Sequence, residues 1–234
     1  MLSNLYQNTV LKNPKSIFLL LVITLLSFGY FTKDFRLDAS SETLLIKGDP
    51  DLEYLKEINK RYGSKEFLIL TYTPIEGMVT ESSINNLLSL KYKIQSLDWV
   101  HNVVTLLDVP LLSNSEAPLQ ERLESFKTLK DEDVDKERGF QEILNSPVFR
   151  NFVISEDGNT SGIIVYIKKN DLKNIENKSK KEIEDYKNSI KKKNHTNILQ
   201  IREVIKSYNN VGKIYLGGIP MIADDMMSFI KSDI

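Results

Sequence analysis

Four acidic side chains have the spacing of a calcium-binding loop. They occupy the first, third, fifth and twelfth places of one window, where an EF-hand loop carries oxygen ligands: Asp131, Asp133, Asp135 and Glu142. Two neighbours oppose calcium binding. Lys136 stands where the sharp turn of such a loop requires glycine, and Arg138 replaces the usual apolar anchor. The pattern therefore favours an acidic surface loop over a metal site.

Other catalytic chemistry has little support in the sequence. The chain has no cysteine, and its two histidines, His101 and His195, are far apart, which disfavours thiolate metal sites and most histidine-based triads. Gly217-Gly218 does not match a dinucleotide-binding or phosphate-binding glycine loop. We expect neither an enzyme nor a bound cofactor.

Composition narrows the class of protein further. The chain has 234 residues, 41% hydrophobic and 27% charged, with 31 basic and 32 acidic side chains. Such a chain is long enough to bury a core and is not disordered in composition. Because the charges cancel to −1, a nucleic-acid partner is not expected.

An uncharged apolar segment lies near the N-terminus. It runs from Ser16 to Thr32, and as a helix would be about 25 Å long, close to the hydrocarbon thickness of a bilayer. Lys12 and Lys15 precede it, so the N-terminus is expected in the cytoplasm. A cleaved signal peptide is the alternative, but no small-x-small cleavage site follows the segment. We therefore expect one uncleaved anchor in the inner (plasma) membrane, with the rest of the chain extracytoplasmic.

The exported part alternates strand and helix signals. We expect helices starting at Asp49-Pro50, Thr80 and Thr196, because apolar residues recur there every three or four positions after capping residues. Strands are expected at 66–73, at 100–107, at 148–155 and 161–168 as a hairpin, and at 213–216. In that hairpin, Asp157-Gly158 would supply the positive φ angles. The last segment, from Met221, has the pattern of an amphipathic helix.

Two stretches interrupt this alternation. Residues 111 to about 147 are polar around the stripes Leu119/Leu123/Phe126 and Phe140/Ile143/Leu144, which predicts a helical insertion. The lysine-rich tract 168–194 predicts a solvated helix or a mobile excursion rather than a binding site.

Together these elements predict an α+β fold: one transmembrane helix followed by a βαββαβ, ferredoxin-like domain with a helical insertion. The expected organisation is a cytoplasmic N-terminus (1–15), a membrane helix (16–32), a linker with a short helix (33–63), an extracytoplasmic domain (64–218), and the start of a further helix (219–234).

An ordered set of short motifs resembles a known family. These are Asp38 to Leu45, Asp49-Pro50, Tyr62-Gly63, Trp99 to Thr105, Asn145-Ser146-Pro147 and Gly218-Ile219-Pro220. In order and spacing they resemble the first membrane helix and first porter region of the resistance-nodulation-division (RND) transporters, in the MMPL-like branch. The resemblance covers nearly the whole chain, but each motif alone is loose.

The resemblance implies proton-driven export of hydrophobic or lipidic compounds by a protein with twelve membrane helices. The expected partners are membrane lipids, the lipidic substrate and the remaining membrane segments of the transporter, and the resemblance leaves room for a homo-oligomer. Residues 219–234 would then begin a helix that leads to a missing second transmembrane helix, and the chain would be a truncated segment that transports nothing alone. No substrate-binding residue can be carried over; Gly217, Gly218 and Pro220 are candidates for a hinge, with an ordinary strand-to-helix turn as the alternative. A single-pass, membrane-anchored domain that binds a ligand or partner is the alternative function.

Overall fold

A computed structural model describes residues 12–32, 49–62, 66–112, 126–168 and 179–233. The chain divides into two compact units, Met1–Asp38 and Ala39–Ile234. The motif at residues 38–45, Gly63, and the predicted stripe residues Leu119 and Leu123 lie outside the described residues.

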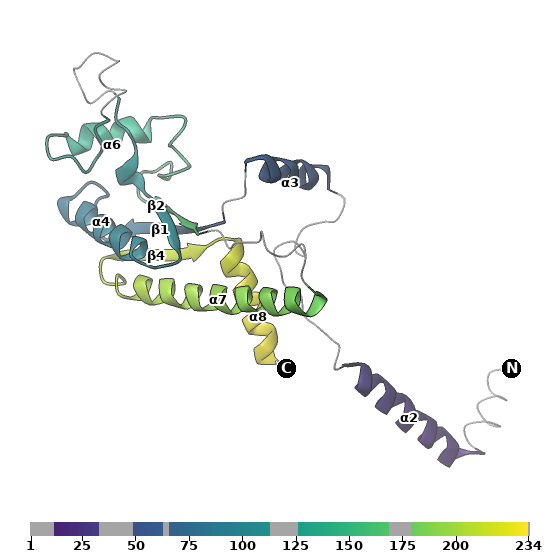
Figure 1. Ribbon diagram of the computed structural model, residues 1–234. Coiled ribbons are helices and arrows are strands. Elements are labelled where there is room, and N and C mark those ends of the chain that lie inside the picture. The colour runs from purple at the N-terminus through teal and green to yellow at the C-terminus, as the bar shows by residue number, and fades with distance from the viewer. Residues whose placement is uncertain (1–11, 33–48, 63–65, 113–125, 169–178, 234) are drawn as a thin grey trace. The chain divides into compact units, whose positions relative to one another are not determined.

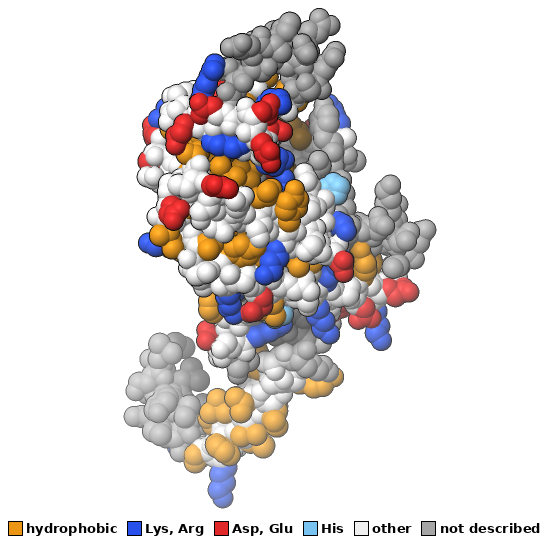
Figure 2. Space-filling model, turned by 90° about the vertical axis from the view of Figure 1, so that its left-hand side faces the viewer, with side chains coloured by type: hydrophobic (Ala, Val, Ile, Leu, Met, Phe, Trp, Pro, Cys, Tyr) orange, Lys and Arg blue, Asp and Glu red, His pale blue; other side chains and the backbone are white. Residues whose placement is uncertain are grey.

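The first unit contains the helix α2 (Pro14–Thr32). Proline suits its first position because the first amides of a helix have no intrahelical acceptor. None of its side chains is buried, and hydrophobic side chains cover the face of α2 visible in Figure 2. Within the described ranges, this is the one helix long and apolar enough to cross a membrane, although a signal sequence has the same properties.

The second unit is a mixed α/β domain built on a four-stranded antiparallel sheet (Figure 1). Its strands are β1 (Phe67–Pro74), β2 (Val100–Val104), β3 (Ser161–Ile167) and β4 (Gly212–Gly217), in the spatial order β2-β3-β1-β4. The helices in its described residues are α3 (Pro50–Tyr62), α4 (Glu81–Gln95), the 3₁₀ turn η2 (Leu106–Asp108), α6 (Lys136–Leu144), α7 (Lys180–Lys206) and α8 (Ile219–Asp233). Helix α4 connects β1 to β2, and α7 connects β3 to β4.

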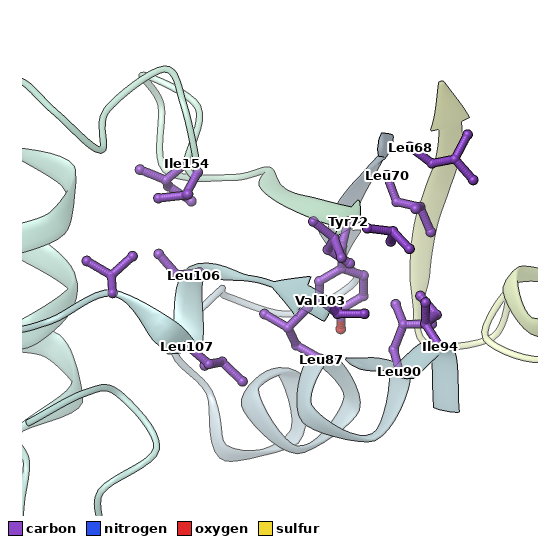
Figure 3. Packing of buried hydrophobic residues seen from close by; sticks show 14 of the residues in the cluster. Leu68, Leu70, Tyr72, Leu87, Leu90, Ile94, Val103, Leu106, Leu107 and Ile154 are labelled. Carbon is purple, nitrogen blue, oxygen red and sulfur yellow. The ribbon is translucent and has the colours of Figure 1, made fainter. Parts of the chain in front are cut away.

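The core lies between the sheet and the helices α4 and α7. Alternate residues of β1 are fully buried, because successive side chains of a strand point to opposite faces: Leu68, Leu70 and Tyr72. They pack in one cluster with Leu87, Leu90 and Ile94 of α4 and Ile198, Ile201 and Ile205 of α7. Figure 3 shows the contribution of β1 and α4 to this cluster. The predicted stripe of α4 is therefore the core-facing stripe.

Several helix boundaries follow from capping residues. The Asp49 carboxylate accepts a hydrogen bond from the amide of Asp51 at 2.9 Å, and α3 begins at Pro50 as predicted. The hydroxyl of Thr80 accepts from the amide of Ser83 at 3.2 Å, which also agrees with the sequence.

The predicted hairpin over 148–155 and 161–168 is wrong in its first half. Residues 148–155 form turns with only isolated bridges, while β3 (Ser161–Ile167) is a true strand. Backbone groups of this segment form hydrogen bonds with one another rather than with a neighbouring strand. The amide of Val153 donates to Phe149 O at 2.9 Å, and the amide of Asn151 donates to Ile154 O at 2.7 Å. Asn151 also has a φ of 62°, which bends the chain away from an extended conformation. In the predicted turn, only Gly158 has a positive φ.

Two other boundaries differ from prediction. The second strand ends at Val104, because Thr105 and Asp108 form a capping box that starts η2. The helix predicted from Thr196 begins at Lys180, where Ser179 and Glu182 form another capping box, and it runs without a break to Lys206. Residues 180–194 of the lysine-rich tract are therefore helical, while residues 169–178 lie outside the described residues.

Candidate functional site

The three hinge candidates lie at the junction of β4 and α8. Gly217 is the last residue of β4 and pairs with Ile69, Gly218 follows, and Pro220 lies in the first turn of α8. Gly218 has a φ of +121°, and a Cβ atom there would lie 3.1 Å from Phe67 O and 3.2 Å from Leu68 Cα. Only glycine fits both the conformation and the space. This junction is a sharp turn held against β1.

Three polar contacts fasten α8 to α7 beyond this turn. Asn194 Nδ2 donates to Pro220 O at 2.9 Å, His195 Nδ1 lies 3.0 Å from both carboxylate oxygens of Asp224, and Arg202 Nη2 donates to both carboxylate oxygens of Asp225 at 2.8 Å. In Figure 1, α8 crosses beside α7.

The burial of these groups differs. The side chain of Asp224 is only 9% exposed, whereas that of His195 is 49% exposed and the Arg202–Asp225 pair is 40% and 30% exposed. A buried carboxylate without a partner is costly, so the His195 contact matters more for Asp224 than the guanidinium does for Asp225. Protonated His195 would form a charged pair with Asp224, and the neutral ring would form a hydrogen bond.

A second polar cluster joins α4 to η2. Asp108 accepts hydrogen bonds from Lys91, from Lys130 at 3.0 Å and from the amide of Thr105 at 2.8 Å. Burial raises the pKa of Asp108, but the hydrogen bonds from Lys91, Thr105 and Lys130 together outweigh it and hold the pKa below its ordinary value. This cluster fixes the start of the insertion to the core.

The four calcium candidates serve separate local purposes. Asp131 accepts from the amide of Thr128 at 2.7 Å, Asp133 pairs with Lys127 at 2.7 Å, Asp135 accepts from the amide of Arg138 at 3.1 Å, and Glu142 accepts from the amide of Leu112 at 2.6 Å. The amide of Thr128 lowers the pKa of Asp131, and Lys127 lowers that of Asp133. Among the residues that the structure describes, no three His, Cys, Asp or Glu side chains gather as metal ligands would.

Sequence reasoning missed the contacts between α7 and α8. The partners are 29 residues apart for His195 and Asp224, and 23 apart for Arg202 and Asp225. No fixed spacing connects residues on two different helices, so no local pattern could have identified these pairs. A weaker signal was present, since Asp224 and Asp225 interrupt an otherwise apolar segment.

Comparison with models of known protein families gave no match, and comparison with curated protein sequences also gave none.

Proposed function

We propose that this chain is the first porter segment of a proton-driven exporter of hydrophobic or lipidic compounds, of the RND type and MMPL-like branch. The observation that carries the proposal is the combination, in one chain, of a membrane-length apolar helix (α2) and a domain with the strand order β2-β3-β1-β4. The family-like motifs from Asp38 to Pro220 are in the order that the proposal requires.

The domain is proposed to be ferredoxin-like. In a split βαβ arrangement, each crossover helix connects two strands that are separated by a third. Here β3 lies between β1 and β2, which α4 connects, and β1 lies between β3 and β4, which α7 connects. The insertion between η2 and β3 is the departure from the simple pattern.

The chain alone is proposed to be unable to transport. Ion coupling inside a membrane requires side chains such as Asp, Glu, His, Lys or Arg there, and residues 16–32 contain none of these five. Proton-relay groups would therefore belong to other membrane segments of the same transporter, in the inner (plasma) membrane, with this domain on the extracytoplasmic side.

A comparison of dye efflux tests the proposal. Cells that make the reading frame continued past codon 234 should extrude a lipophilic dye, and extrusion should stop when the proton gradient is dissipated. Cells that make only residues 1–234 should retain the dye. Efflux by the short chain, or a reading frame that closes after Ile234, would contradict the proposal.

The open face of the sheet favours a second candidate, a membrane-anchored domain that binds a ligand or partner. Phe67 is 44% exposed, Ile69 41% and Tyr215 67%, and the ring of Phe67 lies edge-on against Tyr166. Exposed apolar groups on one sheet face often mark an interaction site. If Phe67→Ser with Tyr215→Ser abolished binding of a ligand while the complete reading frame gave no efflux, this candidate would replace the exporter.

A further inference from the structure

Helix α8 presents an exposed apolar stripe. Its members share one side of the helix, since they recur at intervals of three and four residues. They are Ile219 (56% exposed), Ile222 (47%), Met226 (37%) and Phe229 (69%). A contiguous apolar surface of this kind on a folded domain indicates a contact with another apolar phase or partner.

The helix that carries the exposed stripe is held in place at several points. Asp224 lies off the stripe, whereas Asp225 borders it between Ile222 and Phe229. The two carboxylates hold α8 against α7 through His195 and Arg202. The turn at Gly218 fixes the start of the helix, because its carbonyl accepts hydrogen bonds from the amides of Met221 and Ile222 at 3.1 and 3.0 Å. The stripe is therefore held outward by the rest of the domain.

Exposed lysines lie on α7, and two of them are next in sequence to a residue that contacts α8. Lys187, Lys192 and Lys193 of α7 are exposed, and the last two directly precede Asn194, which contacts the first turn of α8. Acidic side chains that could offset them are Glu182, Glu184 and Asp185 of α7, about two to three turns before Lys192, and Asp233 of α8, which is exposed four residues after Phe229. The carboxylates of α8 nearest to α7 are engaged by His195 and Arg202. An apolar helix face beside lysines is the composition of an interfacial helix that contacts anionic lipid.

We propose that α8 docks on the surface of an anionic lipid bilayer, with its apolar stripe at the acyl boundary and Lys192 and Lys193 at the phosphate groups. The chain carries α2, a helix able to span a membrane, and only residues 33–49 separate α2 from α3. A bilayer that α2 spans is thus an apolar phase to which the rest of the chain is tethered. The docking goes beyond the proposed function, because it would apply equally to an exporter and to an anchored binding domain.

Spin labelling tests the docking directly, because the native chain has no cysteine. The full chain carries one label at Ile222→Cys or Phe229→Cys, in nanodiscs of phosphatidylcholine with phosphatidylglycerol. Matched controls are Ser228→Cys, which is exposed on the same helix but off the stripe, and Tyr215→Cys on the sheet. We expect the labels at 222 and 229 to collide more with oxygen than with a water-soluble nickel chelate, and the labels at 228 and 215 to show the opposite order.

The role of the lysines is tested by changing the charge of the lipid and the charge of the protein. In discs of phosphatidylcholine alone, or with Lys192→Glu and Lys193→Glu, the oxygen preference at 222 and 229 should fall. Equal preference in both bilayers would overturn the role of the lysines, and nickel access at both stripe positions in anionic discs would overturn the docking. Spin–spin broadening between labels would show instead that a second copy covers the stripe. Circular dichroism verifies that each labelled chain is folded, and Met226→Cys replaces any stripe variant that is not.

Discussion

At the scale of single residues, Gly217 and Gly218 are adjacent but have different structural requirements. Gly218 has a φ of +121° and backbone atoms of β1 within 3.2 Å of a Cβ position, whereas a Cβ at Gly217 would meet only Ile69 O at 3.8 Å. Strain in such a conformation costs of order 1–3 kcal/mol. Gly218→Ala should therefore lower the free energy of unfolding of the full chain in detergent by at least that amount, measured by denaturant titration.

Gly217→Ala provides the matched control for that change. It adds the same methyl group one residue away, in a strand, where we expect a change within about 0.5 kcal/mol. Equal destabilisation by the two substitutions would show that the turn does not require glycine at 218, and would favour a hinge that is sensitive at either position.

Asp108 should contribute a pH-dependent part of the stability. Its pKa is held below the ordinary value, so its contribution is present above the unfolded pKa of about 4 and is lost as the pH falls through the lower folded pKa. Asp108→Asn leaves Lys91, only 13% exposed, without its charged partner. At neutral pH, Asp108→Asn should lower the free energy of unfolding by roughly 1–3 kcal/mol. The difference in stability from the native chain should become smaller below about pH 4.

The control for Asp108 is an exposed ion pair. Glu203 and Lys206 are 70% and 67% exposed, so Glu203→Gln should change the stability by no more than about 0.5 kcal/mol at any pH. Urea titrations from neutral pH to about pH 3 compare the three chains. A constant gap for Asp108→Asn across that range would show that the carboxylate titrates alike in folded and unfolded chains.

At the scale of elements, α8 should depend on its contacts with α7. Arg202→Ala removes the guanidinium that holds Asp225, so the amides of α8 should exchange with deuterium faster, while those of α4 in the core should not change. Lys206→Ala removes a charge from the same helix, but its partner Glu203 also lies on α7, and α8 should be unaffected. Unchanged exchange in α8 after Arg202→Ala would show that the Arg202–Asp225 pair is not needed, and that the turn at Gly218 with the contacts of Asn194 and His195 fixes this helix.

Elements with a continuous apolar pattern could be predicted from the sequence. The buried run of β1 and the stripe of α4 show the periodicities of a strand and a helix, and both were found where expected. Residues 148–155 are also apolar, but hydrogen bonds within the segment and a positive φ at Asn151 keep them from pairing as a strand. Helix α7 begins earlier than its apolar stripe because a capping box at Ser179 starts it in charged sequence.

The candidate site was predictable only in part. The sequence identified the turn at Gly217, Gly218 and Pro220, because glycine and proline have distinctive backbone conformations and so mark turns. The partners His195 and Asp224 could not, since their proximity depends on how two helices pack. The acidic residues from Asp131 to Glu142 show that a sequence pattern can also mislead. Their spacing is typical of a calcium-binding loop, but Asp131 accepts a hydrogen bond in a turn and Asp135 caps a helix.

At the scale of the whole molecule, α2 divides the chain between two sides of a membrane if it is an uncleaved anchor. Lys12 and Lys15 lie before it, and positive charge in the short N-terminal segment favours its retention in the cytoplasm. The unit Ala39–Ile234 would then be extracytoplasmic. An alkaline phosphatase fused after Leu45 in a bacterial host should be active, because this enzyme folds only outside the cytoplasm, where its disulfides form.

Reversing the flanking charge tests the cause of this orientation. Lys12→Glu with Lys15→Glu should lower phosphatase activity of the same fusion, since the positive residues that retain the N-terminus are removed. Lys33→Glu is the matched control on the other side of the helix, and it should preserve or raise the activity. N-terminal sequencing of the mature fusion distinguishes an anchor from a signal sequence: a chain that starts at Met1 retains α2, whereas a chain that starts near Ala39 has lost it, and α2 would then be a leader.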